Sequence, residues 1–241
     1  MKAGITAAVP ACHEAENLRW ILPILKKALD ETGEEYTILV IDTAEPTDET
    51  PDICRAEGVD CIPQTYPGFA GAIRTAIECA DREKLLTMDA DGSHDPAYIP
   101  GMVRMFTDKK CDLLIGSRYV PGGGSNDRWV SICMSRLLNL VFQRIIGTDV
   151  KDISSGFKIY NTEKLRSIEI TGINFEIHQE ALLKLFIRYS DFRVSEYPIV
   201  FERRRYDRSK RKLGRFVLSY VRSVFKLIKL RKQANYPGSI K

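Results

Sequence analysis

The chain has 241 residues, 44% of them hydrophobic and 28% charged, a composition typical of a globular protein with one large domain, or one domain and an appendage. No signal peptide and no membrane-spanning run is expected. The six cysteines lack CxxC spacing, which favours the reduced thiols of a cytosolic protein over a disulfide framework or a zinc site; they are residues 12, 54, 61, 79, 111 and 133. The net charge of +4 is uneven, because residues 201–241 hold 14 Lys/Arg and two acids on an otherwise acidic chain; this favours an anionic partner such as a nucleic acid, an anionic membrane or a phosphorylated substrate.

Strands and helices alternate along the first half of the chain. Apolar runs predict strands over residues 4–10, 36–42, 59–64, 84–91 and 111–120, and helical spacing predicts helices over 14–29, 47–58, 68–81 and 96–108. This alternation with short links predicts a mostly parallel α/β sheet, in which ligands bind beyond the carboxyl ends of the strands. Asp42, Asp89 and Asp91 fall at that edge, and Arg118 joins them if the fifth strand runs in the same direction.

The pattern changes after the glycines at 122–124. We expect an amphipathic helix over 128–147, a loop leading into a strand over 152–161, a helix over 175–190 and a strand over 192–204. From Leu213 onward, apolar residues recur at the helical period, at 213, 216, 217, 220, 221, 224, 225 and 228. This stripe can pack on the domain, lie in a membrane interface or bind nucleic acid, and the surrounding Lys/Arg excess favours the membrane.

The segment Asp89-Ala90-Asp91 is the strongest candidate for a metal site. Two carboxylates one residue apart at a strand end can converge on Mg²⁺ or Mn²⁺, with water and substrate phosphates as further ligands. The competing interpretation is a polar turn that begins the next helix, with Asp95 as the N-cap before Pro96. A glycosidase-like carboxylate pair fits less well, because acids this close in a tight turn are poorly placed to flank a bond.

Basic residues supply the complementary charge. Arg118, Arg204 and Lys210 are candidates for binding phosphate, although most of 203–212 is also consistent with a solvated surface. The chain has no GxxxxGK[ST] and no GxGxxG, which argues against a P-loop NTPase or a standard dinucleotide dehydrogenase. The three histidines do not cluster in the sequence, and His94 is more consistent with a turn residue than with a substrate contact.

Six stretches together resemble a known family. VPACHEAENL, VIDTAEPTDET, MDADGSHDP, LIGSRYVPGG, DISSGFKIYN and EYPIVFERRRYDRSK occur in the order and spacing of family 2 glycosyltransferases with the GT-A fold. Over roughly residues 5–214 the chain most resembles the dolichyl-phosphate or polyprenyl-phosphate mannose synthase group. The resemblance implies a Rossmann-like GT-A catalytic domain over 1–212, with a mostly parallel sheet flanked by helices, and a basic amphipathic helix and tail over 213–241.

The resemblance also implies roles for individual residues. The base and ribose of a nucleotide-sugar donor would be bound by Pro10, Cys12, Glu14, Val40 and Asp42. The metal and the diphosphate would be bound by Asp89, Ala90 and Asp91, and Ser93 would complete the metal shell. The donor diphosphate and the acceptor phosphate would be bound by Arg118, Arg204 and Lys210, the last two on a mobile loop over 203–212. Cys12 stands where the group commonly has an aromatic residue, and His13 replaces its usual asparagine. These departures open the possibility of a donor other than GDP-mannose.

The implied activity is a metal-dependent, inverting transfer of a hexose to a polyprenyl or dolichyl phosphate, and mannose from GDP-mannose is the expected sugar and donor. The acceptor would lie at the cytoplasmic membrane face, with the C-terminal helix as an interfacial anchor. A phosphate acceptor needs no general base, since its second pKa is about 6. The alternatives are a transferase of the same fold that uses another donor such as UDP-glucose or a soluble or protein acceptor, and a non-catalytic module that binds a nucleotide sugar or nucleic acid.

Overall fold

A seven-stranded sheet forms the centre of the protein, whose computed structural model describes residues 1–172, 174, 176–203 and 213–238, with only the backbone of 213–221. The sheet has the order β3-β2-β1-β4-β7-β5-β8. Its strands are β1 (Lys2–Pro10), β2 (Tyr36–Asp42), β3 (Asp60–Pro63), β4 (Arg82–Thr87), β5 (Leu113–Ser117), β7 (Lys158–Asn161) and β8 (Val194–Pro198), while β6 (Gly124–Ser125) pairs separately with β9 (Val200–Phe201). The predicted α/β architecture is confirmed.

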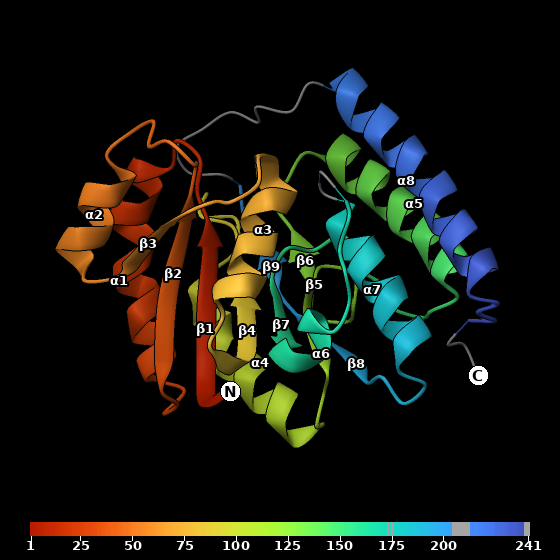
Figure 1. Cartoon of the computed structure of the whole chain (residues 1–241), viewed down its shortest axis with the longest axis horizontal. Coiled ribbons are helices and arrows are strands. Elements are labelled where there is room, and N and C mark those ends of the chain that lie inside the picture. The colour runs from red at the N-terminus through yellow and green to blue at the C-terminus, as the bar shows by residue number, and fades with distance from the viewer. Residues whose placement is uncertain (173, 175, 204–212, 239–241) are drawn as a thin grey trace.

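Helices cover both faces of the sheet (Figure 1). One face packs against α1 (Ala15–Asp30), α2 (Thr50–Glu57) and α4 (Ile99–Asp108), the last preceded by a 3₁₀ turn, η1 (Pro96–Tyr98). The other face packs against α3 (Gly68–Cys79), α5 (Trp129–Ile146), α6 (Thr162–Arg166), α7 (Ile177–Arg188) and α8 (Leu213–Gln233). Helix α1 shows why the sequence folds this way: Leu18, Leu22 and Leu25 lie on one buried face, and Pro23 is tolerated because it lies on the exposed side.

Strand β7 interrupts the parallel sheet. It runs antiparallel to both β4 and β5, and Lys158 pairs with Thr87 on one side and Ile115 on the other. Because β7 runs in the opposite direction, its first residue lies at the edge where β4 and β5 end. The segment that precedes β7 therefore enters the predicted ligand edge between the two strands. Strand β5 has the same direction as β4, so Arg118 does lie at that edge, as the sequence predicted conditionally.

The C-terminal helix exists where it was predicted, but its packed face differs from the predicted apolar stripe. Leu227 lies outside the stripe and is 1% exposed, whereas Phe225 belongs to the stripe and is 69% exposed. Helix α8 packs against α5 and α7 (Figure 1). Arg231 fixes it to the end of α5 by donating to the carbonyl oxygens of Arg144 (3.0 Å) and Ile145 (2.8 Å). Packing on the domain thus accounts for one face of a helix that the sequence favoured as a membrane anchor.

Helix α5 departs from the expectation that no segment could span a membrane. Within the described chain it is the one helix whose length and apolar composition would allow it to cross a bilayer. Its inner side nevertheless packs into the protein, because Asn139, Phe142 and Ile146 are buried. The burial of this inner side ties α5 to the rest of the domain.

Candidate active site

The predicted donor-binding residues converge at the carboxyl ends of β1 and β2. These strands are parallel neighbours, with Pro10 paired to Ile41, so Pro10, Val40 and Asp42 are close together. Glu14 precedes α1 and accepts a hydrogen bond from Asn17 (2.5 Å), and Cys12 is exposed in the loop between β1 and α1. The sheet thus brings all five residues predicted to bind the base and ribose to one end of two adjacent strands.

Asp42 is a buried carboxylate with an incomplete set of hydrogen bonds. It is 1% exposed, and its Oδ1 accepts from the backbone N–H of Thr43 (2.7 Å). Its Oδ2 is buried and has no hydrogen-bond partner among the described residues. Burial, with a smaller contribution from the charge of Asp48, raises the pKa of Asp42 above its ordinary value. An unpartnered buried acceptor at this place can receive an N–H group from a ligand.

The segment Asp89-Ala90-Asp91, called here the DAD segment, follows β4, and its two acids differ in exposure. Ala90 packs in the core between them, Asp91 is 4% exposed, and Asp89 is half-buried. Asp91 accepts two hydrogen bonds from Ser93, from its backbone N–H (3.0 Å) and its hydroxyl (2.5 Å). Asp95 accepts from the backbone N–H of Ala97 (2.9 Å), which confirms its predicted role as a helix cap.

The donor set of this segment fits a hard divalent cation that is shared with a substrate. Carboxylate oxygens suit Mg²⁺ and Mn²⁺. In the described chain no three His, Cys, Asp or Glu side chains are close enough to hold a metal by themselves, so Asp89 and Asp91 would need water and phosphate oxygens as additional ligands. The hydroxyl of Ser93 contacts Asp91 and orients that carboxylate, and the metal-ligand role predicted for Ser93 remains a prediction.

The buried ring of His94 contacts the backbone of the DAD segment. The ring is 1% exposed, stacks on Phe157 (5.1 Å between centroids) and meets Phe201 edge-on (5.4 Å). Burial lowers the pKa of His94, so the neutral ring can accept a hydrogen bond, and its Nδ1 receives the backbone N–H of Asp89 (3.0 Å). The sequence placed His94 in a turn but gave no sign of this buried contact.

Arg118 is held by an aspartate that the sequence did not single out. Its Nε and Nη2 donate to the two carboxylate oxygens of Asp152, at 2.6 and 2.7 Å, and its backbone N–H donates to the same group. Asp152 has no exposed surface. Burial alone would raise the pKa of Asp152, but the hydrogen bonds and charge of Arg118 lower it below its ordinary value. Asn139 on α5 and Ser154 also bond within this cluster.

Two guanidinium groups share one aromatic ring beside this cluster. The Tyr119 ring lies 5.0 Å from the guanidinium carbon of Arg118 and 5.2 Å from that of Arg136, which comes from α5. Arg136 is exposed and has no ion pair or hydrogen bond to the described residues. Asp152 neutralises only one of the two cations, so Arg118 and Arg136 leave a net positive surface suited to a phosphate.

The segment before β7 joins the acidic and basic groups. Lys158 is buried, donates to the carbonyl oxygens of Ile153 and Ser155, and has its pKa lowered to about 7, mainly by burial. Thr87 bonds the carbonyl of Gly156 (2.8 Å). A Cβ atom at Gly156 would lie 3.3 Å from Asp89 Oδ1, tighter than ordinary contact, which explains a glycine where this segment passes the DAD carboxylates.

Arg204 and Lys210, with most of the predicted loop over 203–212, lie outside the described residues. The described chain leads to the site immediately before them. The backbone N–H of Glu202 donates to the carbonyl of Ser93 (3.0 Å), and Arg203 donates to the carbonyl of Asn126 (2.7 Å). The roles predicted for Arg204 and Lys210 therefore remain predictions.

Sequence comparisons identify proteins similar to this chain. The profile of the family described as glycosyl transferase family 2 matches residues 6–169. Undecaprenyl-phosphate mannosyltransferase of Micrococcus luteus is 30% identical over 86% of this chain and 86% of its own length. Dolichol-phosphate mannosyltransferase of Pyrococcus furiosus is 29% identical over 93% of this chain, which spans 64% of that longer relative.

Comparison with solved structures supports the fold. Glucosyl-3-phosphoglycerate synthase from Mycobacterium tuberculosis, in complex with Mn²⁺, UDP and glucosyl-3-phosphoglycerate, superposes with a TM-score of 0.70. The alignment covers 98% of this chain and 82% of that one at 18% sequence identity, which shows a shared fold and leaves donor and acceptor open.

Proposed function

The chain belongs to glycosyl transferase family 2, and from this premise we propose that it transfers a hexose from a nucleotide sugar to a polyprenyl phosphate. The names of the relatives in Micrococcus luteus and Pyrococcus furiosus support a lipid phosphate acceptor and mannose as the sugar. One observation carries the proposal: the sheet edge places Asp89 and Asp91 on one side, Arg118 and Arg136 on the other, and the segment before β7 between them.

The acidic side would bind the donor. Asp42 offers an unpartnered acceptor to an N–H of the base, and GDP-mannose is the donor we propose. Asp89 and Asp91 would hold Mg²⁺ or Mn²⁺ together with the diphosphate. When bound, such a cation neutralises charge that develops on the leaving diphosphate. His94 and Ser93 keep the two carboxylates in place through the Asp89 N–H and the Asp91 carboxylate.

The basic side would bind the acceptor phosphate. A phosphate oxygen attacks the anomeric carbon, the bond from that carbon to the diphosphate breaks, and the diphosphate leaves with the electron pair, so the anomeric configuration inverts. The acceptor is already ionised near neutral pH, since its second pKa is about 6, and no side chain has to remove a proton. Arg118 and Arg136 orient the phosphate electrostatically, and Asp152 keeps Arg118 in a fixed position before substrate arrives.

A polyprenyl phosphate acceptor requires a membrane, and we propose that the protein works at the cytoplasmic membrane face. Helix α8 contributes through its cations, since Arg222, Lys226, Lys229 and Lys232 are exposed. Cations on a surface helix attract anionic lipid headgroups.

Lipid-linked product formation tests this function. Purified protein is incubated with polyprenyl phosphate, Mn²⁺ and radiolabelled GDP-mannose or UDP-glucose, and organic extraction separates lipid-linked sugar from free donor. We expect GDP-mannose to give a labelled lipid phosphate sugar that depends on the divalent cation. Absence of product with both donors would refute the activity, whereas product from UDP-glucose alone would keep the reaction and change the donor.

A further inference from the structure

Helix α5 carries an exposed apolar surface that the fold does not use. Trp129, Val130, Leu137 and Leu140 are 74%, 49%, 62% and 43% exposed, and Cys133 is also exposed. These five side chains, the α5 apolar face, recur at the spacing of one side of a helix. Single exposed apolar residues are common, but a contiguous row on one helix indicates an interaction surface. We propose that the α5 apolar face inserts into an anionic membrane surface and is the main membrane-docking element of the protein.

The opposite side of α5 fixes how the helix can meet lipid. Asn139 exchanges hydrogen bonds with Ser154, whose hydroxyl also binds Asp152, and Phe142 and Ile146 have no exposed surface. A helix that spans a bilayer as a separate segment would lose these contacts. Helix α5 therefore lies in the plane of the interface, with its apolar face towards the acyl chains and its inner side still packed on the domain.

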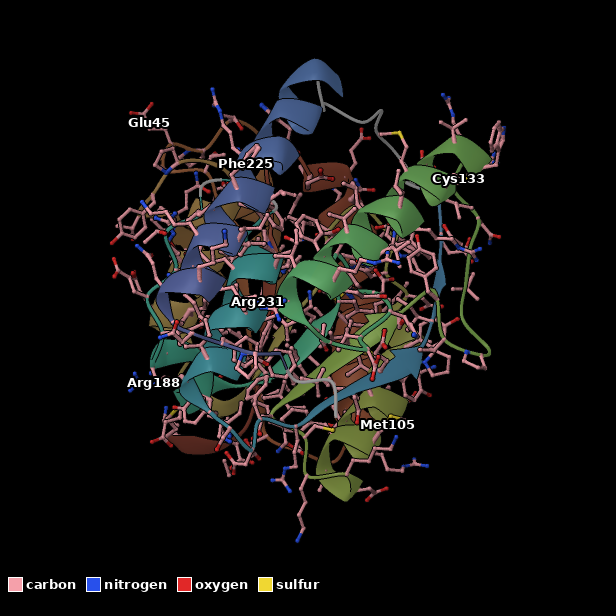
Figure 2. All side chains as sticks on the ribbon, turned by 90° about the vertical axis from the view of Figure 1, so that its right-hand side faces the viewer. Glu45, Met105, Cys133, Arg188, Phe225 and Arg231 are labelled. Atoms are coloured by element: carbon pink, nitrogen blue, oxygen red, sulfur yellow. The ribbon has the colours of Figure 1, made fainter. Side chains whose placement is uncertain are left out.

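Charge selects the membrane over a second copy of this chain as the partner. Helices α5 and α8 together carry eight Lys/Arg and no Asp or Glu. The two helices lie side by side on one face, with Cys133 on α5 and Phe225 on α8 (Figure 2). Pairing this face with itself would bring cations of two copies together, which opposes association. Anionic headgroups would instead neutralise them, while lipid tails accept the apolar side chains.

The same orientation explains how an acceptor reaches the site, and here the inference rests on the proposed function. Arg136 belongs to α5 and stacks on Tyr119, whose ring also meets Arg118. With α5 in the interface, these two cations lie at the level of the headgroups. A lipid phosphate can then bind Arg118 and Arg136 while its hydrocarbon tail stays in the bilayer, so the acceptor does not have to leave the membrane.

Tryptophan fluorescence tests insertion directly. The chain has two tryptophans, Trp20 on α1 and Trp129 at the start of α5, so Trp20→Phe leaves Trp129 as the only reporter. Vesicles of phosphatidylcholine and phosphatidylglycerol are expected to shift its emission to the blue, and lipids brominated on the acyl chain to quench it. Vesicles of phosphatidylcholine alone should bind more weakly. Vesicle binding without a change in Trp129 emission, or no binding at all, would overturn the proposal.

Paired variants separate α5 from α8. We expect Leu137→Gln/Leu140→Gln to weaken partition into anionic vesicles about tenfold or more, because two exposed apolar side chains no longer enter lipid. Phe225→Gln, the matched exposed apolar residue on α8, should weaken it about threefold or less. The proposal fails if Phe225→Gln has the larger effect. It also fails, in favour of a self-association surface, if sedimentation shows a dimer that Leu137→Gln/Leu140→Gln dissociates while vesicles do not bind.

Activity on a short, water-soluble prenyl phosphate keeps the two proposals separate. Leu137→Gln/Leu140→Gln should retain the turnover of the parent protein in solution and lose activity only on acceptor embedded in vesicles. Equal loss on both acceptors would mean that the face serves the active site and not docking. A parent protein that inserts Trp129 but transfers no sugar would refute the function alone, and one that transfers sugar in solution without inserting Trp129 would refute the surface alone.

Discussion

Asp42 and Asp152 are two buried aspartates at the same edge of the sheet, and their surroundings are opposite. Asp152 has both oxygens bonded by Arg118, and the pKa of Asp152 is lowered. Asp42 keeps one oxygen without a partner in the described chain, and the pKa of Asp42 is raised by burial. The carboxylate of Asp152 is fully bonded within the protein, whereas the proposed function assigns the unpartnered oxygen of Asp42 to the base of the donor.

This difference extends to the two halves of the site. The half built by β5, β7 and α5 is internally bonded around Asp152, so Arg118 is held in position before any substrate binds. The half built by β1, β2 and β4 presents Asp42, Asp89 and Asp91. Under the proposed function Asp42 would bind the base, and a divalent cation would balance the negative charge of Asp89, Asp91 and the diphosphate. This contrast suits the proposed reaction, in which a preorganised Arg118 would meet the acceptor phosphate and the donor would arrive with its own divalent cation.

The largest effect on stability is expected from removing the carboxylate of Asp152. Asp152→Ala leaves Arg118 without its buried partner, and we expect the free energy of unfolding to fall by about 3–5 kcal/mol. Urea denaturation near neutral pH measures this. Asp149→Ala, an exposed neighbour, is the control and should change stability by about 0.5 kcal/mol or less. A loss for Asp152→Ala as small as that of the control would contradict the comparison.

Asp91→Asn tests, through activity, the half of the site that is built by β1, β2 and β4. We expect the transfer rate to fall about 100- to 1,000-fold, as when one charge-stabilising group is lost, while the fold is retained. Initial rates across a Mn²⁺ titration, with circular dichroism as a check on folding, measure the effect. The matched acid is Asp95, because Asp95→Asn alters a helix cap and should leave the rate within a few fold. Undiminished activity of Asp91→Asn would remove this carboxylate from the donor site.

Glu180 is another carboxylate with both oxygens bonded. It forms ion pairs with Lys184 (2.7 Å) and Lys226 (2.9 Å), and the second of these connects α7 to α8. Burial would raise the pKa of Glu180, but the two lysines lower it to about 2. Its stabilisation is therefore complete above the ordinary value of 4.5 and lost as pH falls towards 2. Glu180→Gln should remove about 2–3 kcal/mol near neutral pH and flatten the acid limb of thermal denaturation. An unchanged acid limb would contradict this.

The smallest effect, with the opposite sign, is expected at Asp42. Asp42→Asn should leave stability unchanged or raise it by about 1 kcal/mol, since it removes an unpartnered buried charge. Because the pKa of Asp42 is raised in the folded state, the folded protein binds this proton more tightly than the unfolded chain does. The stability that this proton contributes is complete below the ordinary value of 3.8 and is lost as pH rises, so the stability advantage of Asp42→Asn should grow with pH. Denaturation of both proteins from below pH 3.8 to near neutral pH measures this difference in stability. In the transfer assay, the KM of Asp42→Asn for the donor should rise. Destabilisation like that of Asp152→Ala would show that Asp42 is already satisfied.

The sequence predicted the parts of the site that lie at strand ends. Buried strands followed by acids located Asp42, Asp89 and Asp91, and the alternation of strands and helices predicted that these strands would be parallel. The cap at Asp95 was also readable, because a short polar side chain before proline is a local signal. In each case the information lies within a few residues, where periodicity and turn chemistry act.

The tertiary structure alone decided which distant groups meet. Nothing in the spacing predicted that β7 would enter between β4 and β5, and this strand order brings Asp152 to Arg118, 34 residues away, and Gly156 to Asp89. The apolar stripe of α8 likewise did not determine its buried face. Helical periodicity shows that a helix has an apolar side, but the competition among helices for one core decides which side is covered. Here α8 was packed against its neighbours and the α5 apolar face was left in solvent.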